Sequence, residues 1–533
     1  MKKSNGSCSH FPLLTFTLRR ERILSPLWIL SLLLFSVLLA VFMDGMFDDA
    51  SRAALALTLD NPGIIAMMGP VYGAEHYTVG AMYATTMFLW AALAVAVMNL
   101  FLIVRYTRAD EECGRCDMLD SLPLGRMAGL RAAVLTAVIA DGALGLLHAL
   151  FLALLPIGSM GLRGCLVYGA GLSLNGLVFA GVAAVCCQLF ASSGTALSVS
   201  IGVLGVSYLL RAVGDLGSGC LSLLSPLGLM QRTQPFVRDE FLPLLILLAE
   251  AALLLSFACL LRRVRESGQG VLPPRSGRSR ASRFLRSPLT LALRLLKTPL
   301  LICLLTMFAF GAAYGSILGD IETFAAQSEF YQALIGVRAD YPVAVMFASM
   351  VICILSLLGT APLLAAISQL WNEEKRGRLE AVFCQPPTRV SSLAGRIVIA
   401  LAASVLLQIA SAFGLFLSGS VVLTEPLSLP FLLRASLVYL PAQWITLGLS
   451  VFLLGAAPRL LNGVWIYFGC SFFVAFIGRS LDLPEWLSVL TPFSMIPQLP
   501  ADEISSGVLL AMTLLAAALF TAGTLLYRKR DLA

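Results

Sequence analysis

The sequence predicts an all-α polytopic membrane protein with about 12 transmembrane helices, arranged as two parallel six-helix halves. Of the 533 residues, 58% are hydrophobic and only 13% are charged, about half the charged share of a soluble domain. The apolar residues come in blocks of about 20, the length that crosses the hydrocarbon core of a bilayer. Landmarks in the first half of the chain recur in the second, which predicts an internal repeat.

The apolar blocks predict twelve membrane spans. They cover 27–43, 81–104, 132–155, 165–190, 195–213, 243–261, 300–318, 343–371, 398–421, 432–455, 463–478 and 506–527. An even number of spans places both termini on one side of the membrane. If that side is the inside, 29 of the 37 lysines and arginines fall in inner segments. The positive-inside rule therefore predicts that both termini are cytoplasmic.

Three landmarks occupy the same places in the two halves: before the first span, after the second and before the sixth. They are 25–27 with 298–300, 114–115 with 377–378, and 221–226 with 487–492. The repeat predicts a first six-helix transmembrane half over 1–261 and a second over 288–533. Between them, 262–287 is basic and rich in Gly, Pro and Ser. We expect it to be a flexible cytoplasmic linker.

Two loops with one pattern follow the second and eighth spans. Each has two acidic residues, a Gly-Arg pair, a further acidic residue and a closing arginine after proline. The residues are Asp110, Glu111, Gly114, Arg115, Asp117 and Arg126 in the first loop, and Glu373, Glu374, Gly377, Arg378, Glu380 and Arg389 in the second. We expect each loop to form a short helix that begins at its acidic residues, because the positive end of the helix dipole favours them.

Each predicted short helix has an apolar stripe. The stripe residues are Met118, Leu119 and Leu122 in the first, and Leu379, Val382 and Phe383 in the second. An apolar stripe with a charged rim suits docking into a groove on a soluble partner. The alternative is a helix that rests on the membrane surface.

The two loops resemble the coupling helix of ABC-2-type permeases. The wider pattern is similar to the polyketide-antibiotic exporter permeases of the tetronasin-resistance type, and the resemblance covers nearly the whole chain. The matching segments are 18–22, 26–28, 110–126, 224–228, 234–236, 261–263, 272–275 and 287–289. The resemblance implies two type V exporter-like halves. It also implies that the twelve loop residues couple the chain to an ATPase.

The resemblance further implies the permease subunit of an ATP-driven ABC exporter in a prokaryotic plasma membrane. Its substrates would be hydrophobic or amphipathic small molecules or peptides of the drug and antibiotic class. Two copies of a separate ABC ATPase subunit would bind the ATP and Mg²⁺. The sequence agrees, since it has no G-x-x-x-x-G-K-[ST] motif to hold phosphates. We expect no catalytic residue, no metal, no cofactor and no nucleic-acid partner for the chain itself.

Three ionisable residues lie inside predicted spans: Asp141, His148 and Glu250. A charge at the membrane centre costs about 2.5–3.5 kcal/mol on insertion scales, so we treat them as candidates for a translocation path, with structural pairing as the alternative. If Asp141 or Glu250 carried protons, the chain would be an ion-coupled secondary transporter. A non-transporting membrane signalling partner is a third reading. Neutral polar residues inside spans are expected to bond between helices; they are Asn99, Asn175 and Gln408.

Overall fold

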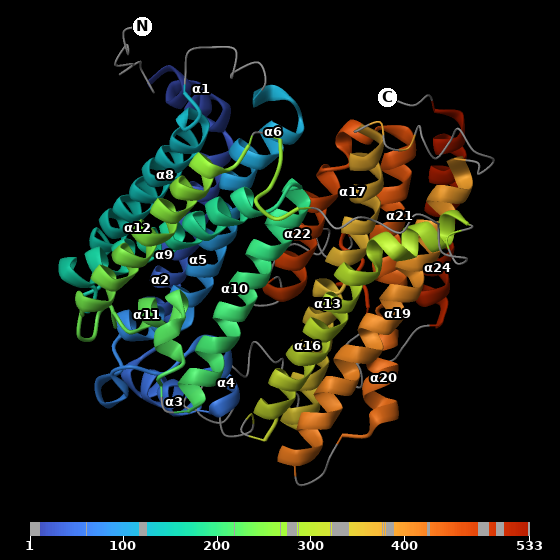
Figure 1. Ribbon diagram of the computed structural model, residues 1–533. Coiled ribbons are helices and arrows are strands. Elements are labelled where there is room, and N and C mark those ends of the chain that lie inside the picture. The colour runs from blue at the N-terminus through green and yellow to red at the C-terminus, as the bar shows by residue number, and fades with distance from the viewer. Residues whose placement is uncertain are drawn as a thin grey trace, which may run out of the picture. The chain divides into compact units, whose positions relative to one another are not determined.

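The protein folds into two compact units, Met1–Gly277 and Arg278–Ala533, and the division falls inside the stretch 262–287. The structure is a computed structural model. It describes residues 11–59, 61–116, 125–217, 219–266, 268–273, 285, 287–319, 321, 341–375, 377, 379, 389–423, 427–477, 490–496 and 506–530. These residues form helices and loops, with no strand among them (Figure 1).

The first unit contains long apolar helices joined by shorter ones. In chain order they are α1 (Phe11–Glu21), α2 (Leu24–Met46), α3 (Asp49–Leu59), α4 (Pro62–Met68), η1 (Ala74–His76), α5 (Val79–Val104), the π-helical turn η2 (Arg105–Ala109), α6 (Asp110–Glu112), α8 (Ala128–Ala153), α9 (Leu162–Leu189), α10 (Ser193–Leu216), η3 (Ser222–Leu224), α11 (Pro226–Gln231) and α12 (Leu242–Val264).

The second unit follows the same plan. Its helices are α13 (Pro288–Ile317), α16 (Val343–Leu358), α17 (Ala361–Lys375), α19 (Arg389–Val422), α20 (Leu429–Leu437), α21 (Leu440–Ala456), η4 (Pro458–Leu460), α22 (Gly463–Ile477) and α24 (Ser506–Lys529).

Eleven helical segments within the described residues are long and apolar enough to cross a membrane, which confirms a polytopic all-α membrane protein. The remaining predicted span, 463–478, coincides with α22, an apolar helix of 15 residues. The segments Val79–Glu112 and Val343–Lys375 have 34 and 33 residues. At 1.5 Å per residue each is about 50 Å long, well beyond a hydrocarbon core of about 30 Å. Their charged ends therefore extend past the hydrocarbon.

Helix α9 is the centre of the first unit and packs against α5, α8, α10 and α12 (Figure 1). Its closest approach is to α8, where Gly169 faces Gly145. A Cβ atom on either glycine would overlap the backbone carbonyl oxygen of the other. Small residues let helix backbones approach in lipid, where van der Waals packing replaces the hydrophobic effect as the force between helices.

The second unit uses the same device at two other interfaces. Helix α13 packs along α19, and a Cβ on Gly311 would overlap the carbonyl oxygen of Ser411. Helix α21 packs along α24, where Gly455 meets the carbonyl oxygen of Gly523. The glycines inside these spans are therefore packing positions, consistent with the uninterrupted helices around them.

The first part of the predicted linker is held against the first unit. Helix α12 continues to Val264, and the chain then runs along the end of α9. There the Val271 amide donates to the Gln188 carbonyl oxygen at 3.0 Å, and the Leu272 amide donates to Leu189 O at 2.9 Å. The expectation of a flexible linker is wrong for these residues, because their backbone groups are paired. Residues 274–284 lie outside the described part of the chain.

Candidate functional site

The acidic residues of both loops end a long helix, whereas the sequence analysis had them begin a short one. Glu111 lies at the end of the segment Val79–Glu112, and Glu374 lies at the end of α17. Glycine follows each of them in the left-handed conformation, with φ of 69° at Gly114 and 67° at Gly377. The amide of Gly114 donates to Glu111 O at 3.1 Å. Glycine in this conformation is a common helix terminator.

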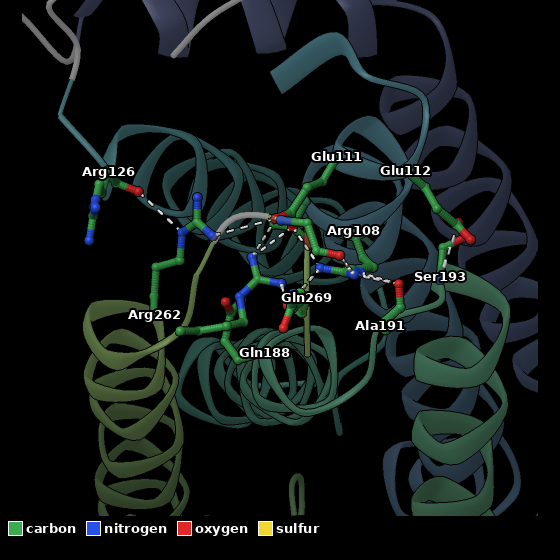
Figure 2. Close-up of polar contacts among 12 residues, drawn as sticks. Arg108, Glu111, Glu112, Arg126, Gln188, Ala191, Ser193, Arg262 and Gln269 are labelled. Carbon is green, nitrogen blue, oxygen red and sulfur yellow. Dashed lines mark hydrogen bonds and ion pairs between the residues drawn. The ribbon is translucent and has the colours of Figure 1, made fainter. Parts of the chain in front are cut away.

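Carboxylates at a helix C-terminus face the negative end of the dipole, so they need nearby cations. Glu111 has them. Arg265 donates to both of its carboxylate oxygens, at 2.7 and 2.9 Å, and the Gly268 amide donates at 2.6 Å. Only 9% of the Glu111 side chain is exposed. Figure 2 shows Glu111 between Arg108 and Arg262, whose guanidinium lies 3.7 Å from it.

The turn before these acidic residues aims an arginine at the same site. Arg108 belongs to η2, a single π-helical turn, and such turns often occur at functional sites. Its guanidinium donates to Glu111 at 2.9 Å, to Gly268 O at 2.9 Å, and also to the carbonyl oxygen of Ala191 (Figure 2). Arg108 thereby joins the end of α5, the α9–α10 turn and the segment after α12.

The two neighbours of Glu111 bind other helices. Asp110 accepts two hydrogen bonds from Arg20 of α1, at 2.6 and 3.1 Å, and one from Arg115 at 2.8 Å. The hydrogen bond to Asp110 raises the pKa of Arg20 above its usual value. Glu112 accepts from the amide and the hydroxyl of Ser193, at the start of α10 (Figure 2). Three consecutive carboxylates thus bind three different helices.

In the second unit, Glu374 pairs with Arg530, which follows α24. The Glu374 side chain is 1% exposed. Arg530 also donates to Leu454 O at 2.6 Å, and its guanidinium lies 5.3 Å from the ring centroid of Trp371 and equally far from that of Tyr527. Cations over aromatic faces are attracted by the ring quadrupole. Arg530 is therefore fixed on several sides.

The residues next to this pair also bind helix ends. Glu373 pairs at 2.6 Å with Arg396, a buried arginine of α19. Arg389, at the start of α19, donates to Arg530 O at 3.0 Å. Arg126 has the equivalent place in the first unit, where its carbonyl oxygen accepts from Arg262 at 3.2 Å. The predicted loop residues thus gather in each unit beside the end of its last long helix.

The same ion pair recurs in both units. Glu111 and Glu374 lie 263 residues apart, and their partners Arg265 and Arg530 lie 265 apart. Each pair joins the end of the second span to the chain directly after the sixth. We call Glu111–Arg265 and Glu374–Arg530 the anchor pairs. The sequence analysis missed both arginines as partners, although their near-constant spacing from the repeat was visible.

Three predicted coupling residues lie outside the described part of the chain: Asp117, Arg378 and Glu380. The stripe residues Met118, Leu119, Leu122, Val382 and Phe383 lie outside it too. Leu379 is described and buried. The docking role of the loops stays a prediction.

The three intramembrane candidates are not joined to one another by any hydrogen bond in the described structure. Asp141 and His148 are fully buried on α8, where the Asp141 carboxyl accepts from Asn99 at 2.8 Å and His148 Nδ1 lies 2.8 Å from Leu144 O. Glu250 lies half-buried on α12. The neutral polar residues bond between helices as expected: Asn99 to Asp141, Asn175 to Ala92 O, and Gln408 to Ser436 and Ser356.

Comparison with known proteins gives two matches. A family model described as the multidrug efflux system permease Rv1217c, C-terminal domain, matches residues 285–528. The multidrug efflux system permease protein Rv1217c of Mycobacterium tuberculosis is 31% identical over 544 residues, which cover 99% of this chain and 96% of that protein. This supports a drug-efflux permease and lends no support to the narrower tetronasin-resistance type. The whole length of the chain is matched, and it therefore belongs to the family of the multidrug efflux system permease Rv1217c.

Proposed function

We propose that this chain is the permease subunit of an ATP-driven exporter that moves hydrophobic or amphipathic drugs out of the cell. Its family supports the efflux of drugs. The energy source must lie elsewhere, because the sequence contains no phosphate-binding G-x-x-x-x-G-K-[ST] motif. Two copies of a separate ABC ATPase subunit, with their ATP and Mg²⁺, fit this requirement. Both termini and both anchor pairs then lie on the cytoplasmic side of the plasma membrane.

The observation that carries the proposal is the repeated anchor pair. Two identical motor subunits need two equivalent contact points, and the chain has one acidic Gly-Arg segment in each half. Each segment is tied by its glutamate to an arginine after the last long helix of its unit. The segments are thus attached to the bundle at two places, the second span and the end of the sixth.

The ties give the motor a way to act on the bundle. A ligand shifts a conformational equilibrium only if it interacts differently with the two states. When two ATPase subunits close on ATP, a contact that pushes each acidic segment would also displace Arg265 and Arg530, and with them the ends of α12 and α24. ATP binding would then favour one of the two access states of the permease.

The proposal is tested in native membranes with a tagged chain. We expect a Walker-type ATPase to co-purify at two copies per permease, and inside-out vesicles to accumulate ethidium when ATP is added. Polyketide antibiotics are the next compounds to test, since the chain resembles their exporters. Accumulation that ignores ATP and collapses with the proton gradient would instead establish an ion-coupled transporter. Absence of both transport and a bound ATPase would leave the signalling reading.

The coupling role is tested by reversing one anchor pair. Glu374→Arg should lower drug-stimulated ATPase activity of the purified complex, and the swapped pair Glu374→Arg with Arg530→Glu should restore much of it. The control is Glu75→Arg, an exposed residue of η1, which should leave the activity unchanged. Full activity in Glu374→Arg, with the protein folded, would remove the anchor pair from the mechanism while leaving the ATP-driven exporter intact.

A further inference from the structure

A polar cluster lies within the helices of the first unit, away from the anchor pairs. At its centre is Asp141 of α8, which is fully buried. One carboxyl oxygen accepts a hydrogen bond from Asn99 Nδ2 of α5 at 2.8 Å. The same Nδ2 donates to Val95 O at 3.0 Å, so both of its protons are used. Helix α9 covers the cluster at Gly176, where an added Cβ would lie 2.7 Å from Asp141 Oδ1.

No cation pairs with Asp141 among the described residues, although every other buried carboxylate at a helix end described above has an arginine. Titratable groups nearby do not replace one: His148, two turns along α8, contacts the Leu144 carbonyl oxygen. An ionised carboxylate buried without a counter-charge is far less stable than its neutral form. The surroundings of Asp141 therefore suit an uncharged group.

Hydrogen bonding points the same way. The second carboxyl oxygen of Asp141 has no partner within the described structure, and the side-chain oxygens of Asn99 and Asn175 have none either. All three are acceptors when the carboxyl is ionised, so none can satisfy another. Adding one proton turns Asp141 Oδ2 into a donor. Buried polar groups are nearly always paired, and a neutral acid reduces the deficit.

The internal repeat supplies an independent comparison. Gln408 of α19 lies 267 residues after Asp141, and its Oε1 accepts from Ser436 at 2.7 Å and from Ser356 at 3.2 Å. Gln443 of α21 lies 268 residues after Asn175. It donates to Ser356 O at 2.7 Å, as Asn175 donates to Ala92 O at 3.0 Å. Both units therefore have a buried polar cluster on their second, third and fourth spans, and the second unit uses a neutral amide at the central position.

We propose that Asp141 is a proton-binding site, held as an uncharged carboxylic acid in the folded permease, and that it performs the hydrogen-bonding role that Gln408 performs in the other unit. The ligand is one proton on the carboxyl group. It enters with folding and insertion, and it stays bound while the helices α5, α8 and α9 exclude water. The site is independent of the ATPase proposal, because it lies on no anchor residue.

Infrared spectroscopy of the reconstituted full chain tests the proposal directly. At about pH 8 exposed aspartates are ionised, whereas a protonated carboxyl shows a C=O stretch above the amide I band. We expect such a band in the wild type, shifted by ¹³C-labelled aspartate and lost in Asp141→Asn. The isotope label excludes Glu250 and needs no variant. Absence of a label-sensitive protonated band in the wild type would overturn the proposal.

Variants sharpen the result. Asp141→Asn keeps a neutral hydrogen-bonding group, so its apparent melting temperature should stay close to that of the wild type. Asp141→Leu removes the polar group and should lower the melting temperature by several degrees. Gln408→Glu, the matched change in the second unit, should add a protonated band, now sensitive to labelled glutamate. If Asp141→Asn is destabilised and the wild type gains stability from added Na⁺, the site binds a cation and the proposal fails.

Discussion

The two anchor pairs join equivalent points of the two units by different means. In the first unit, Glu111 has several donors: Arg265, Arg108, the Gly268 amide, and Arg262 nearby. In the second, the described structure gives Glu374 one cation, Arg530, which is held by Trp371 and Tyr527. Trp371 occupies the place that Arg108 has, 263 residues earlier. One unit shares the charge among many groups, and the other concentrates it in one pair.

Removing the arginine of each pair should therefore have unequal effects. Arg530→Met leaves Glu374 buried without a cation, which is expected to cost about 3–5 kcal/mol of folding free energy. Arg265→Met leaves Glu111 with Arg108 and the Gly268 amide, so we expect roughly 1–2 kcal/mol, about the worth of one hydrogen bond to a charged group. The measurement is the apparent melting temperature of purified protein in nanodiscs, followed by size-exclusion chromatography of heated samples.

The double variant Arg530→Met with Glu374→Gln is the control. It removes the buried charge as well as its partner and should recover part of the lost stability, because the unpaired carboxylate causes most of the loss. Equal melting temperatures for Arg530→Met and Arg265→Met would contradict the view that the first unit is redundant and the second is not.

A smaller inequality is expected one residue earlier. Asp110 binds Arg20 of α1, whose side chain is 25% exposed, whereas Glu373 binds Arg396, which is 4% exposed. Glu373→Gln leaves a buried guanidinium short of acceptors and should cost roughly 2–3 kcal/mol. Asp110→Asn weakens a solvent-accessible pair and should cost about 1 kcal/mol or less.

Limited proteolysis separates these two changes further. Asp110→Asn should make α1 easier to cleave, because Arg20 holds that helix against the end of α5, whereas Glu373→Gln should have no such effect on the N-terminus. If neither variant changes the cleavage of α1, the contact between Arg20 and Asp110 does not hold the helix in place.

The sequence predicted the membrane fold well because its signal is local. A block of about 20 apolar residues is sufficient evidence for a span, and only 463–478 forms a helix shorter than expected. The anchor pairs were not predicted because Glu111 and Arg265 are 154 residues apart, and Glu374 and Arg530 are 156 apart. Local patterns contain no information on such pairing.

The direction of the acidic segments was misjudged for a related reason. Adjacent carboxylates are typical of a helix start, but a glycine two or three residues later is typical of a helix end. At Glu111 and Glu374 the glycine decided the outcome, because distant arginines neutralised the unfavourable charge at the helix end. Local electrostatics alone pointed to the wrong end of the helix.

The smallest predicted effect concerns a contact present in the first unit alone. Glu112 accepts from the amide and hydroxyl of Ser193, at the start of α10, where a carboxylate suits the positive end of the dipole. The position 263 residues later is Lys375, whose ammonium lies 4.9 Å from the Trp371 ring centroid. Glu112→Gln should cost about 0.5–1 kcal/mol, and Lys375→Gln a similar amount through its lost cation–π contact. Melting temperatures that fall by more than those of the anchor variants would mean that Ser193, and not Arg265, holds the end of the second span.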